Sequence, residues 1–276
     1  MSDVEAAVAL WPDDQPFAVL TGAGCSTSAG IPDYRDKHGE WKHARPVQYA
    51  DFMAQHAVRQ RYWARSMLGW PRMALAEPTE CHRSLANLQD AGWINGIITQ
   101  NVDRLHQRAG SSAIDLHGAL EEVQCQSCGA EWQRREWQSR IADLNPDWAA
   151  TVSSVRDAPD GDAIVEGADY ASFVVPDCDR CGGIVKPKVV FFGENVPKPR
   201  VEAAFDMVHS AAGLLVVGSS LMVFSGLRFV RAAHQSDKPV IIINRGITRG
   251  DDLATVKIEA DVGECTRALY EALSAR

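Results

Sequence analysis

The sequence predicts an α/β fold whose centre is a parallel sheet with helices on both faces. Short runs of continuous apolar residues alternate with segments of helical periodicity, as in parallel sheets that are covered on both sides. A glycine-rich turn follows the first apolar run, at the end of a strand where open α/β sheets bind ligands. Two Cys-x-x-Cys pairs interrupt the alternation. We therefore expect a Rossmann-like part and a smaller module that is helical and carries the cysteines.

The composition is that of a globular protein. The 276 residues are 46% hydrophobic and 23% charged, which is enough for a substantial core. The net charge of −8 argues against a general nucleic-acid binder, which needs a basic face. No apolar run reaches the length of a membrane span, so we expect neither nucleic acid nor membrane as a partner. Residues 1–16 are acidic and lack arginine, unlike a signal or transit peptide, which predicts a cytoplasmic protein.

Each element is expected where an apolar pattern is bounded by turn residues. Continuous apolar runs predict buried strands, and apolar residues that recur every three or four positions predict helices. The strands are expected over residues 17–20, 93–99, 189–194, 214–218, 240–244 and 255–258. The helices are expected over residues 50–66, 81–90, 201–212, 226–234 and 264–273, with Pro71 and Pro78 as breaks. Residues 143–179 hold nine acidic residues and one basic residue, and we expect a long, partly mobile surface insertion there.

The glycine-rich turn at residues 21–36 is a candidate nucleotide site. Gly22 and Gly24 would let the backbone approach a pyrophosphate at a helix start. The next glycine is Gly30, so the G-x-G-x-x-G fingerprint of dinucleotide sites is not met, and the glycines alone fit a tight turn equally well. The run from Gly30 to Arg35, Gly-Ile-Pro-Asp-Tyr-Arg, favours the nucleotide site because a turn needs no Asp-aromatic-Arg sequence.

Polar residues follow three further predicted strands. The run Gln100-Asn101-Val102-Asp103 places two amides and a carboxylate at one strand end; capping of a helix through Arg108 would explain one of them and leave two unexplained. The other two strands end in Gly218-Ser219-Ser220 and Asn244-Arg245-Gly246, which suit hydroxyl and ribose contacts. Ordinary turn chemistry between strand and helix explains these last two runs equally well.

The cysteine spacing predicts a metal site. Cys125, Cys128, Cys178 and Cys181 form two Cys-x-x-Cys pairs, each followed by glycine, and four thiolates close a tetrahedral Zn²⁺ site with no open position. Such a zinc is structural and does not activate water; a pair of redox dithiols is the alternative. The remaining cysteines, at positions 25, 81 and 265, stand alone, and the uneven count does not indicate a disulfide framework.

His117 is a candidate catalytic residue. It follows an apolar run and precedes Gly118. Its setting alone favours a buried structural histidine, although imidazole is the side chain best suited to proton transfer near neutral pH.

Taken together, these motifs resemble the signature of the sirtuins, the NAD-dependent protein deacylases. The matching segments are G-A-G-x-S-x-x-x-G-I-P-D-Y-R at 22–35, T-Q-N-V-D at 99–103, L-H-G at 116–118, the two cysteine pairs, K-P-x-x-V-x-F-G-E at 186–194, V-G-S-S-L at 217–221 and Asn244. The resemblance covers roughly residues 17–273 and overturns the structural interpretation of His117. A closer resemblance is to the class II branch, carried by residues 59–65, 69–71, 144–148 and 158–162. The Tyr-x-x-Arg pair with which the class III branch reads succinyl groups is not evident at residues 40–43. Cys25 stands where the family usually has a small or apolar residue, which we interpret as a structural variation.

The resemblance implies one catalytic domain over residues 1–276. Its Rossmann-like part would be about 16–36, 81–120 and 186–276, and its small module about 37–80 (helical) and 121–185 (zinc-binding). NAD would lie across the strand ends, with one structural Zn²⁺ elsewhere. The implied NAD contacts are Gly22, Ala23, Gly24, Thr27, Asp33, Tyr34, Arg35, Gln100, Asn101, Val102, Asp103, His117, Gly218, Ser219, Ser220, Asn244, Arg245, Gly246 and Val262.

The resemblance also implies the chemistry. Nicotinamide leaves, the carbonyl oxygen of an acyl-lysine protein or peptide takes its place on the ribose, and His117 removes a proton from a ribose hydroxyl. Asn101 would orient ribose and water, and Asp103 would hold the nicotinamide amide. The peptide would add as a strand beside residues 193–194 and 221–223. Two other functions stay open: a mono-ADP-ribosyltransferase that uses the same pocket, and a non-enzymatic NAD sensor or zinc-ribbon interaction module.

Overall fold

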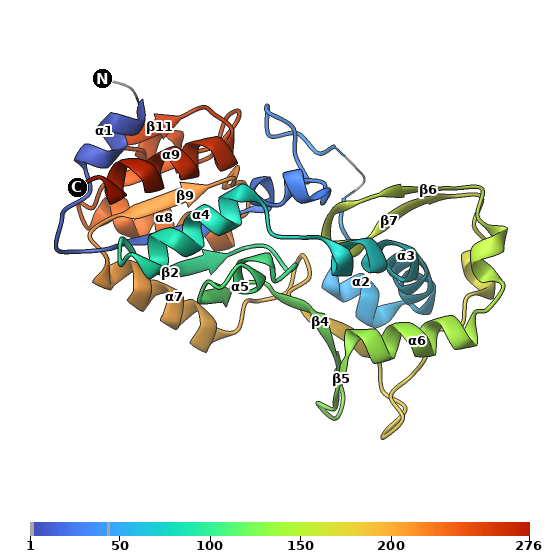
Figure 1. The fold of residues 1–276 in the computed structure, drawn as a ribbon. Coiled ribbons are helices and arrows are strands. Elements are labelled where there is room, and N and C mark those ends of the chain that lie inside the picture. Colours follow the sequence, from blue (N-terminus) through green and yellow to red (C-terminus); the bar gives the residue numbers. More distant parts are fainter. Residues whose placement is uncertain (1–2, 43–44) are drawn as a thin grey trace. The chain divides into compact units, whose positions relative to one another are not determined.

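The computed structural model describes residues 3–42 and 45–276, and they form two compact units (Figure 1). Unit 1 comprises Met1–Lys42, Glu77–Leu116 and Val196–Arg276, and unit 2 comprises His43–Ala76 and His117–Asn195. Within the described ranges, no helix is both long and apolar enough to cross a membrane. The comparison with the class III pair at 40–43 falls partly outside the described residues, because His43 is not among them.

Unit 1 is built on a six-stranded sheet in the order β11-β10-β9-β1-β2-β3. Every pairing in it is parallel, as predicted from the continuous apolar runs. The strands are β1 (Phe17–Thr21), β2 (Ile94–Thr99), β3 (Ala113–Asp115), β9 (Leu214–Val217), β10 (Val240–Ile243) and β11 (Val256–Ile258).

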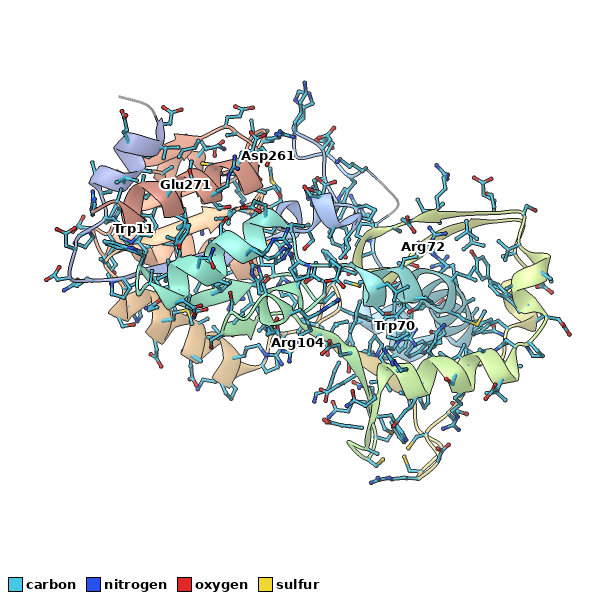
Figure 2. The ribbon with its side chains drawn as sticks, viewed as in Figure 1. Trp11, Trp70, Arg72, Arg104, Asp261 and Glu271 are labelled. Carbon is cyan, nitrogen blue, oxygen red and sulfur yellow. The ribbon has the colours of Figure 1, made fainter. Side chains whose placement is uncertain are left out.

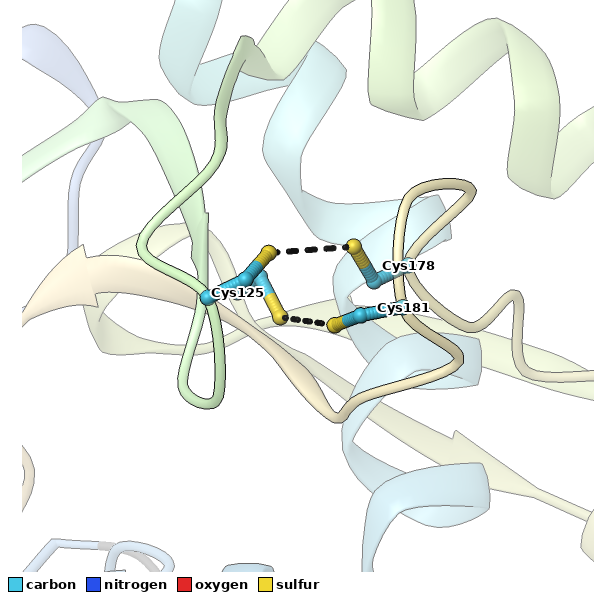
Figure 3. Close-up of side chains that lie close together, drawn as sticks. Cys125, Cys178 and Cys181 are labelled. Atoms are coloured by element: carbon cyan, nitrogen blue, oxygen red, sulfur yellow. Dashed lines mark hydrogen bonds between the residues drawn. The ribbon is translucent and has the colours of Figure 1, made fainter.

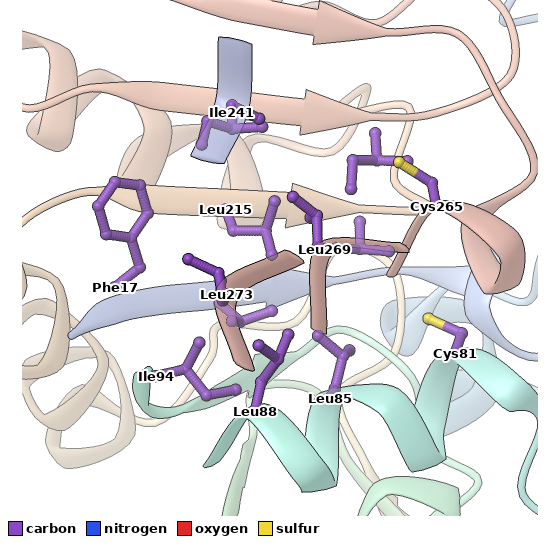
Figure 4. Close-up of a cluster of buried hydrophobic side chains, with 14 of the residues drawn as sticks. Phe17, Cys81, Leu85, Leu88, Ile94, Leu215, Ile241, Cys265, Leu269 and Leu273 are labelled. Carbon is purple, nitrogen blue, oxygen red and sulfur yellow. The ribbon is translucent and has the colours of Figure 1, made fainter. Parts of the chain in front are cut away.

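The sheet of unit 1 buries a different set of side chains on each face, because successive residues of a strand point to opposite sides. Phe17, Val19 and Leu215 face one side, where they pack with residues of α1, α4 and α9 (Figure 4). Ala18, Leu20 and their neighbours face the other side and pack with α7 and α8. The helices are α1 (Asp3–Ala9), α4 (Glu80–Asp90), α5 (Leu105–Arg108), α7 (Lys198–Ser210), α8 (Phe224–Gln235) and α9 (Val262–Ser274). Unit 1 is thus the predicted three-layer fold.

Unit 2 combines helices with two small antiparallel sheets. The order β5-β4-β8 makes a three-stranded sheet, and β6 and β7 form a separate hairpin. Its elements are α2 (Tyr49–Ala54), α3 (His56–Leu75), β4 (Gly118–Cys125), β5 (Glu131–Gln133), α6 (Arg134–Leu144), β6 (Ser154–Asp157), β7 (Ala163–Glu166) and β8 (Val185–Val189).

The core of unit 2 contains a buried cation. The Arg134 guanidinium lies 4.7 Å from the centre of the Trp70 ring and 5.4 Å from that of Trp63. It donates hydrogen bonds to the carbonyl and hydroxyl oxygens of Ser66 and to Gln138. Trp70 is labelled on α3 in Figure 2. Burial lowers the pKa of Arg134 to about 10, so aromatic faces and hydrogen bonds hold a charge that is taken out of water.

Two sequence expectations for this region are wrong. Residues 189–194 do not form a strand, because β8 ends at Val189. β8 is an edge strand that contains Pro187 between two lysines, so it lacks the continuous apolar run that predicts a buried strand. Pro71 does not break α3; the Met67 carbonyl, which a proline at 71 cannot bond, accepts a hydrogen bond of 2.8 Å from the Gln138 side chain instead. The acidic segment 143–179, expected as a long surface insertion, contains the β6–β7 hairpin.

Candidate functional site

The predicted nucleotide site lies where the strand order of unit 1 reverses. From β1 the chain builds outward through β2 and β3, and it later returns to pair β9 with the opposite side of β1 before adding β10 and β11. Open α/β sheets bind ligands in the crevice outside the carboxyl ends of the strands at such a switch point. β1 ends at Thr21 and β9 at Val217, so the predicted glycine turn and the Gly218 turn both start at this crevice.

The two turns touch through their glycines, and no side chain fits between them. A Cβ on Gly22 would lie 2.8 Å from the Gly218 carbonyl oxygen, and one on Gly24 would lie 2.8 Å from the Gly218 Cα. The Gly24 N–H donates a 2.9 Å hydrogen bond to the Gly218 carbonyl. Gly218 itself has φ +63°, a backbone conformation that favours glycine. The result is a bare-backbone cradle of the kind that admits a pyrophosphate, with Ala23 between the two glycines.

A hydrogen-bonded cluster lies behind this cradle. The Asn101 amide donates to the Gly22 carbonyl and to the Ser26 hydroxyl, both at 3.1 Å. The Ser26 hydroxyl in turn donates to Asp103 Oδ2 at 2.6 Å. Asn101 and Asp103 are both buried, so the cluster fixes their side chains in one orientation.

Ser26 is a site residue that the sequence analysis misses. It is the serine of the G-A-G-x-S pattern, so the motif itself was the available signal.

Asp103 has an unusual electrostatic position. Burial raises its pKa, while the Ser26 hydroxyl and the Leu105 N–H, which donates to Oδ1 at 2.9 Å, act to lower it. The capping alternative is therefore partly right, because Asp103 satisfies the first N–H group of α5. Its second oxygen is left for the polar cluster, which simple capping does not require.

The neighbouring strand ends complete the crevice. Gln100 donates to the Ser219 hydroxyl at 2.8 Å, and Ser219 accepts a further hydrogen bond from the Leu221 N–H. The Gly218 N–H donates to the carbonyl of Ile243, the last residue of β10, so the turn that starts at Asn244 lies next in the sheet.

The remaining predicted contacts on this side are spread around the crevice. The Asn244 amide donates to the Arg245 and Gly246 carbonyls. Val262 begins α9, Ser220 accepts from the Arg249 N–H, and Thr27 donates to the Gly24 carbonyl. Val102, which lies between Asn101 and Asp103 in the sequence, is buried.

The run Asp33-Tyr34-Arg35 is paired within its own loop. Asp33 forms an ion pair of 2.5 Å with Lys42. The Arg35 guanidinium lies 3.9 Å from the centre of the Trp41 ring, and Tyr34 packs edge-on against the same ring. The loop reaches the strand ends through Lys37, whose carbonyl accepts from Ile247. These three residues thus belong to a folded flap of unit 1, and their contact with NAD stays a prediction.

His117 is the first residue of the second segment of unit 2 and directly follows Leu116, the last residue of the second segment of unit 1. Leu116 is hydrogen-bonded to the Thr99 carbonyl at the end of β2, so the chain leaves unit 1 at the carboxyl edge of its sheet. In unit 2, the His117 carbonyl accepts a 2.7 Å hydrogen bond from Val190. Gly118 follows with φ +81°, and a Cβ there would lie 2.1 Å from the Lys188 carbonyl oxygen, so only glycine fits after the histidine.

The four predicted metal ligands converge in unit 2 (Figure 3). Their sulfurs all lie within 4.8 Å of one another, with Cys125 and Cys181 3.5 Å apart and Cys128 and Cys178 3.6 Å apart. Sulfurs about 2.3 Å from a tetrahedral Zn²⁺ are about 3.8 Å apart, so this donor set fits zinc. The separations are longer than the about 2.05 Å of a disulfide, so the four cysteines are free thiols in this arrangement.

Each cysteine pair lies on the same kind of turn. Gly129 and Gly182 have φ near +70°, and their N–H groups donate to the carbonyls of Cys125 and Cys178. Burial acts to raise the pKa of Cys125, but hydrogen bonds from the Cys128 and Ser127 N–H groups lower it to about 6, which favours the thiolate that a metal requires. The glycine after each second cysteine thus lets the backbone turn beneath the sulfurs.

Comparison with known proteins identifies the family. The model of the Sir2 family matches residues 22–225. An "NAD-dependent protein deacetylase 2" of Bradyrhizobium diazoefficiens is 54% identical over 246 residues, covering 89% of each chain, and an "NAD-dependent protein deacetylase" of Bordetella bronchiseptica is 48% identical over 275 residues, covering 99% of this chain and 98% of the other.

Solved structures agree with this assignment. A structure described as "Sir2-p53 peptide-NAD+" superposes with a TM-score of 0.78 at 32% identity over the full length of both chains. A Sir2 structure with a deacetylated p53 peptide and 3'-O-acetyl ADP-ribose gives 0.79 at 32% identity over 98% of each chain. The chain belongs to the Sir2 family, the sirtuins.

Proposed function

We propose that this chain is an NAD-dependent protein lysine deacylase in which His117 is the catalytic base. The observation that carries the proposal lies in unit 1, where a bare-glycine cradle and the Asn101–Ser26–Asp103 cluster meet at the strand ends. The relatives named NAD-dependent protein deacetylases and the Sir2 structures that hold acetylated or deacetylated peptide support deacylation over ADP-ribosyl transfer.

The residues of the crevice divide into binding and orienting roles. The Gly22–Gly24 turn lets the pyrophosphate approach bare backbone, and Ser219 and Asn244 offer polar groups to the ribose at the next strand ends. Asn101 orients the ribose and a water molecule, and Asp103 accepts a hydrogen bond from the carboxamide of the nicotinamide. Bound NAD supplies the chemistry as substrate, because loss of nicotinamide leaves a ribose carbon that the acyl oxygen of lysine can attack.

His117 removes a proton from a ribose hydroxyl, so that the acyl group can move to the ribose. A general base of this kind contributes about 10²–10⁴-fold to the rate. The left-handed Gly118 fixes the chain directly after the imidazole, which supports the proposal that His117 is held in place by its backbone rather than by a mobile loop.

Zinc on Cys125, Cys128, Cys178 and Cys181 has a structural role in this proposal. The four thiolates leave no open position for water or substrate. We propose one catalytic domain made of both units, whose substrate is an acyl-lysine protein or peptide. The class II branch and the cytoplasmic location stay predictions that rest on the sequence.

The test replaces His117 with alanine, and with glutamine as a neutral side chain of similar reach. Both variants should lose about 10²-fold or more in turnover of an acetyl-lysine peptide while they keep zinc, folded circular dichroism and NAD binding by calorimetry. Turnover near the wild-type rate in folded His117→Ala would overturn the assignment of the base.

A further inference from the structure

Two cysteines that the proposed function does not use lie close together next to the Gly22–Gly24 turn. Cys25 belongs to the short 3₁₀ turn Ala23–Cys25, and Cys81 lies in the first turn of α4. Their sulfurs are 3.4 Å apart, although the residues are 56 positions apart in the chain. The Cys81 thiol donates to Cys25, whose own thiol donates to the Val217 carbonyl at 3.4 Å. All three groups belong to unit 1.

We infer that Cys25 and Cys81 are a modification site: a hydroperoxide oxidises them to a disulfide that weakens NAD binding. A disulfide requires an S–S separation of about 2.05 Å, so the two sulfurs need to approach by roughly 1.4 Å. Both thiols also line a cavity of about 260 Å³ beside polar side chains, which include Glu80, Glu264 and Arg267. A cavity of this size and polarity can hold water, and a small peroxide can enter it.

The reaction balances with the peroxide as the only oxidant. One thiol, as thiolate, attacks a peroxide oxygen; the O–O bond breaks, one water leaves and a sulfenic acid forms. The second sulfur attacks that sulfenic sulfur, the S–O bond breaks, and the second water leaves with the remaining thiol proton. The two sulfurs lose two electrons in total and the peroxide gains them. The hydrogen bond between the two thiols and burial raise the pKa of Cys25, so oxidation should be faster at alkaline pH.

The cradle has no slack to absorb the movement of Cys25. Its N–H donates to the Gly22 carbonyl at 3.0 Å, and a Cβ on Gly218 would lie 2.7 Å from the same nitrogen. A disulfide would draw the Cys25 sulfur away from Val217 and toward α4, and would pull the Gly22–Gly24 backbone with it. A displacement of about 1 Å in a positioned site can cost up to about 100-fold, so we expect kcat/KM for NAD to fall about tenfold or more. This consequence rests on the proposed NAD site, whereas formation of the disulfide does not.

Tryptic peptides separate these cysteines cleanly. Residues 1–35 contain Cys25 alone, residues 73–83 contain Cys81 alone, and residues 258–267 contain Cys265 alone. The zinc-bound protein is treated with hydrogen peroxide at pH 7 and pH 9, and linked peptides, zinc content and deacylation are measured before and after dithiothreitol. Deacylation by the reduced protein is recorded first, so that failure of the proposed function is seen independently.

We expect a linked 1–35/73–83 peptide, retained zinc, faster formation at pH 9, and a loss of NAD-dependent rate that dithiothreitol reverses. Cys81→Ala should keep the basal rate and resist peroxide, while Cys265→Ala, a buried thiol of α9 near Cys81 (Figure 4), should stay as sensitive as the wild type. The proposal is overturned by linkage to Cys265, by inactivation that accompanies zinc loss without the linked peptide, by equal sensitivity of Cys81→Ala, or by a linked protein whose KM for NAD is unchanged.

Discussion

Different interactions stabilise the interior of each unit. In unit 1, both faces of one parallel sheet are covered by helices, and the strands β1, β9 and β10 are buried along their whole length. In unit 2, the sheet β5-β4-β8 is small, one core group is a charged arginine, and four sulfurs converge at the turns that carry the cysteine pairs. Apolar burial is thus sufficient to place the cradle, whereas we expect unit 2 to depend on a metal bound where the two cysteine turns meet.

The largest effect should come from removing a zinc ligand. Cys128→Ala leaves three thiolates, and structural zinc contributes about 10–16 kcal/mol of apparent binding free energy in zinc-finger peptides, so unit 2 should unfold or aggregate. Zinc content by elemental analysis and thermal unfolding measure this. Cys265→Ala in unit 1 is the control and should keep both zinc and fold. Soluble, active Cys128→Ala without metal would contradict the structural role.

A methyl group in the cradle should be nearly as damaging. The Cβ of Gly24→Ala meets backbone atoms of Gly218 at 2.8 Å, so one of the two turns must move. We expect a rise of about tenfold or more in KM for NAD, because displacements near 1 Å in a positioned site have effects of this order. Gly92→Ala is the control: its Cβ meets open space, and only a left-handed backbone cost of about 1–2 kcal/mol applies. Equal NAD kinetics in both variants would show that the tight contact is not part of the site.

Asp103→Asn should separate function from stability. The loss of one charge-assisted hydrogen bond, about 1.5–3 kcal/mol, should lower kcat/KM for NAD about tenfold to hundredfold.

The same substitution should change how stability depends on pH. Because burial raises the folded-state pKa of Asp103 above its unfolded value, its contribution to stability is present at low pH and is lost as the pH rises through the raised pKa. The asparagine does not titrate, so the melting temperature of Asp103→Asn relative to the wild type should increase from pH 4 to pH 8. A difference in melting temperature that is independent of pH would show that burial does not raise the pKa of Asp103.

The smallest effects should come from the exposed rim. Arg245 is mostly exposed and forms a 3.3 Å ion pair with Asp261, labelled at the start of α9 in Figure 2. Arg245→Ala should cost less than about 1 kcal/mol of stability and raise KM for NAD only severalfold. Asp261→Ala should cost about 1 kcal/mol, because its side chain caps α9 through the N–H groups of Gly263 and Glu264. Equal losses of stability in the two variants would argue against this ranking.

The sequence predicted unit 1 better than unit 2, for physical reasons. A strand buried on both faces is a continuous apolar run, so β1, β9 and β10 were found within a residue or so of their ends. β8 is a mixed edge strand that contains Pro187, and α3 passes through Pro71 because a side chain on α6 replaces the lost hydrogen bond; neither local pattern shows this.

The site followed the same rule. Residues with motif spacing, such as the four cysteines, were recognised and converge as expected. The role of Ser26 depends on bonds to Asn101 and Asp103, 75 and 77 positions away, which spacing along the chain does not reveal.

The most direct test of the account follows the atoms of one turnover. The purified protein is incubated with NAD and an acetyl-lysine peptide, and the products are identified by mass spectrometry. The same assay is run on a panel of peptides with longer and acidic acyl groups on lysine. We predict equal amounts of nicotinamide, free-lysine peptide and O-acyl-ADP-ribose for at least one acyl group. Nicotinamide release with the acyl group still on lysine and ADP-ribose attached to protein would contradict the account and establish ADP-ribosyl transfer instead.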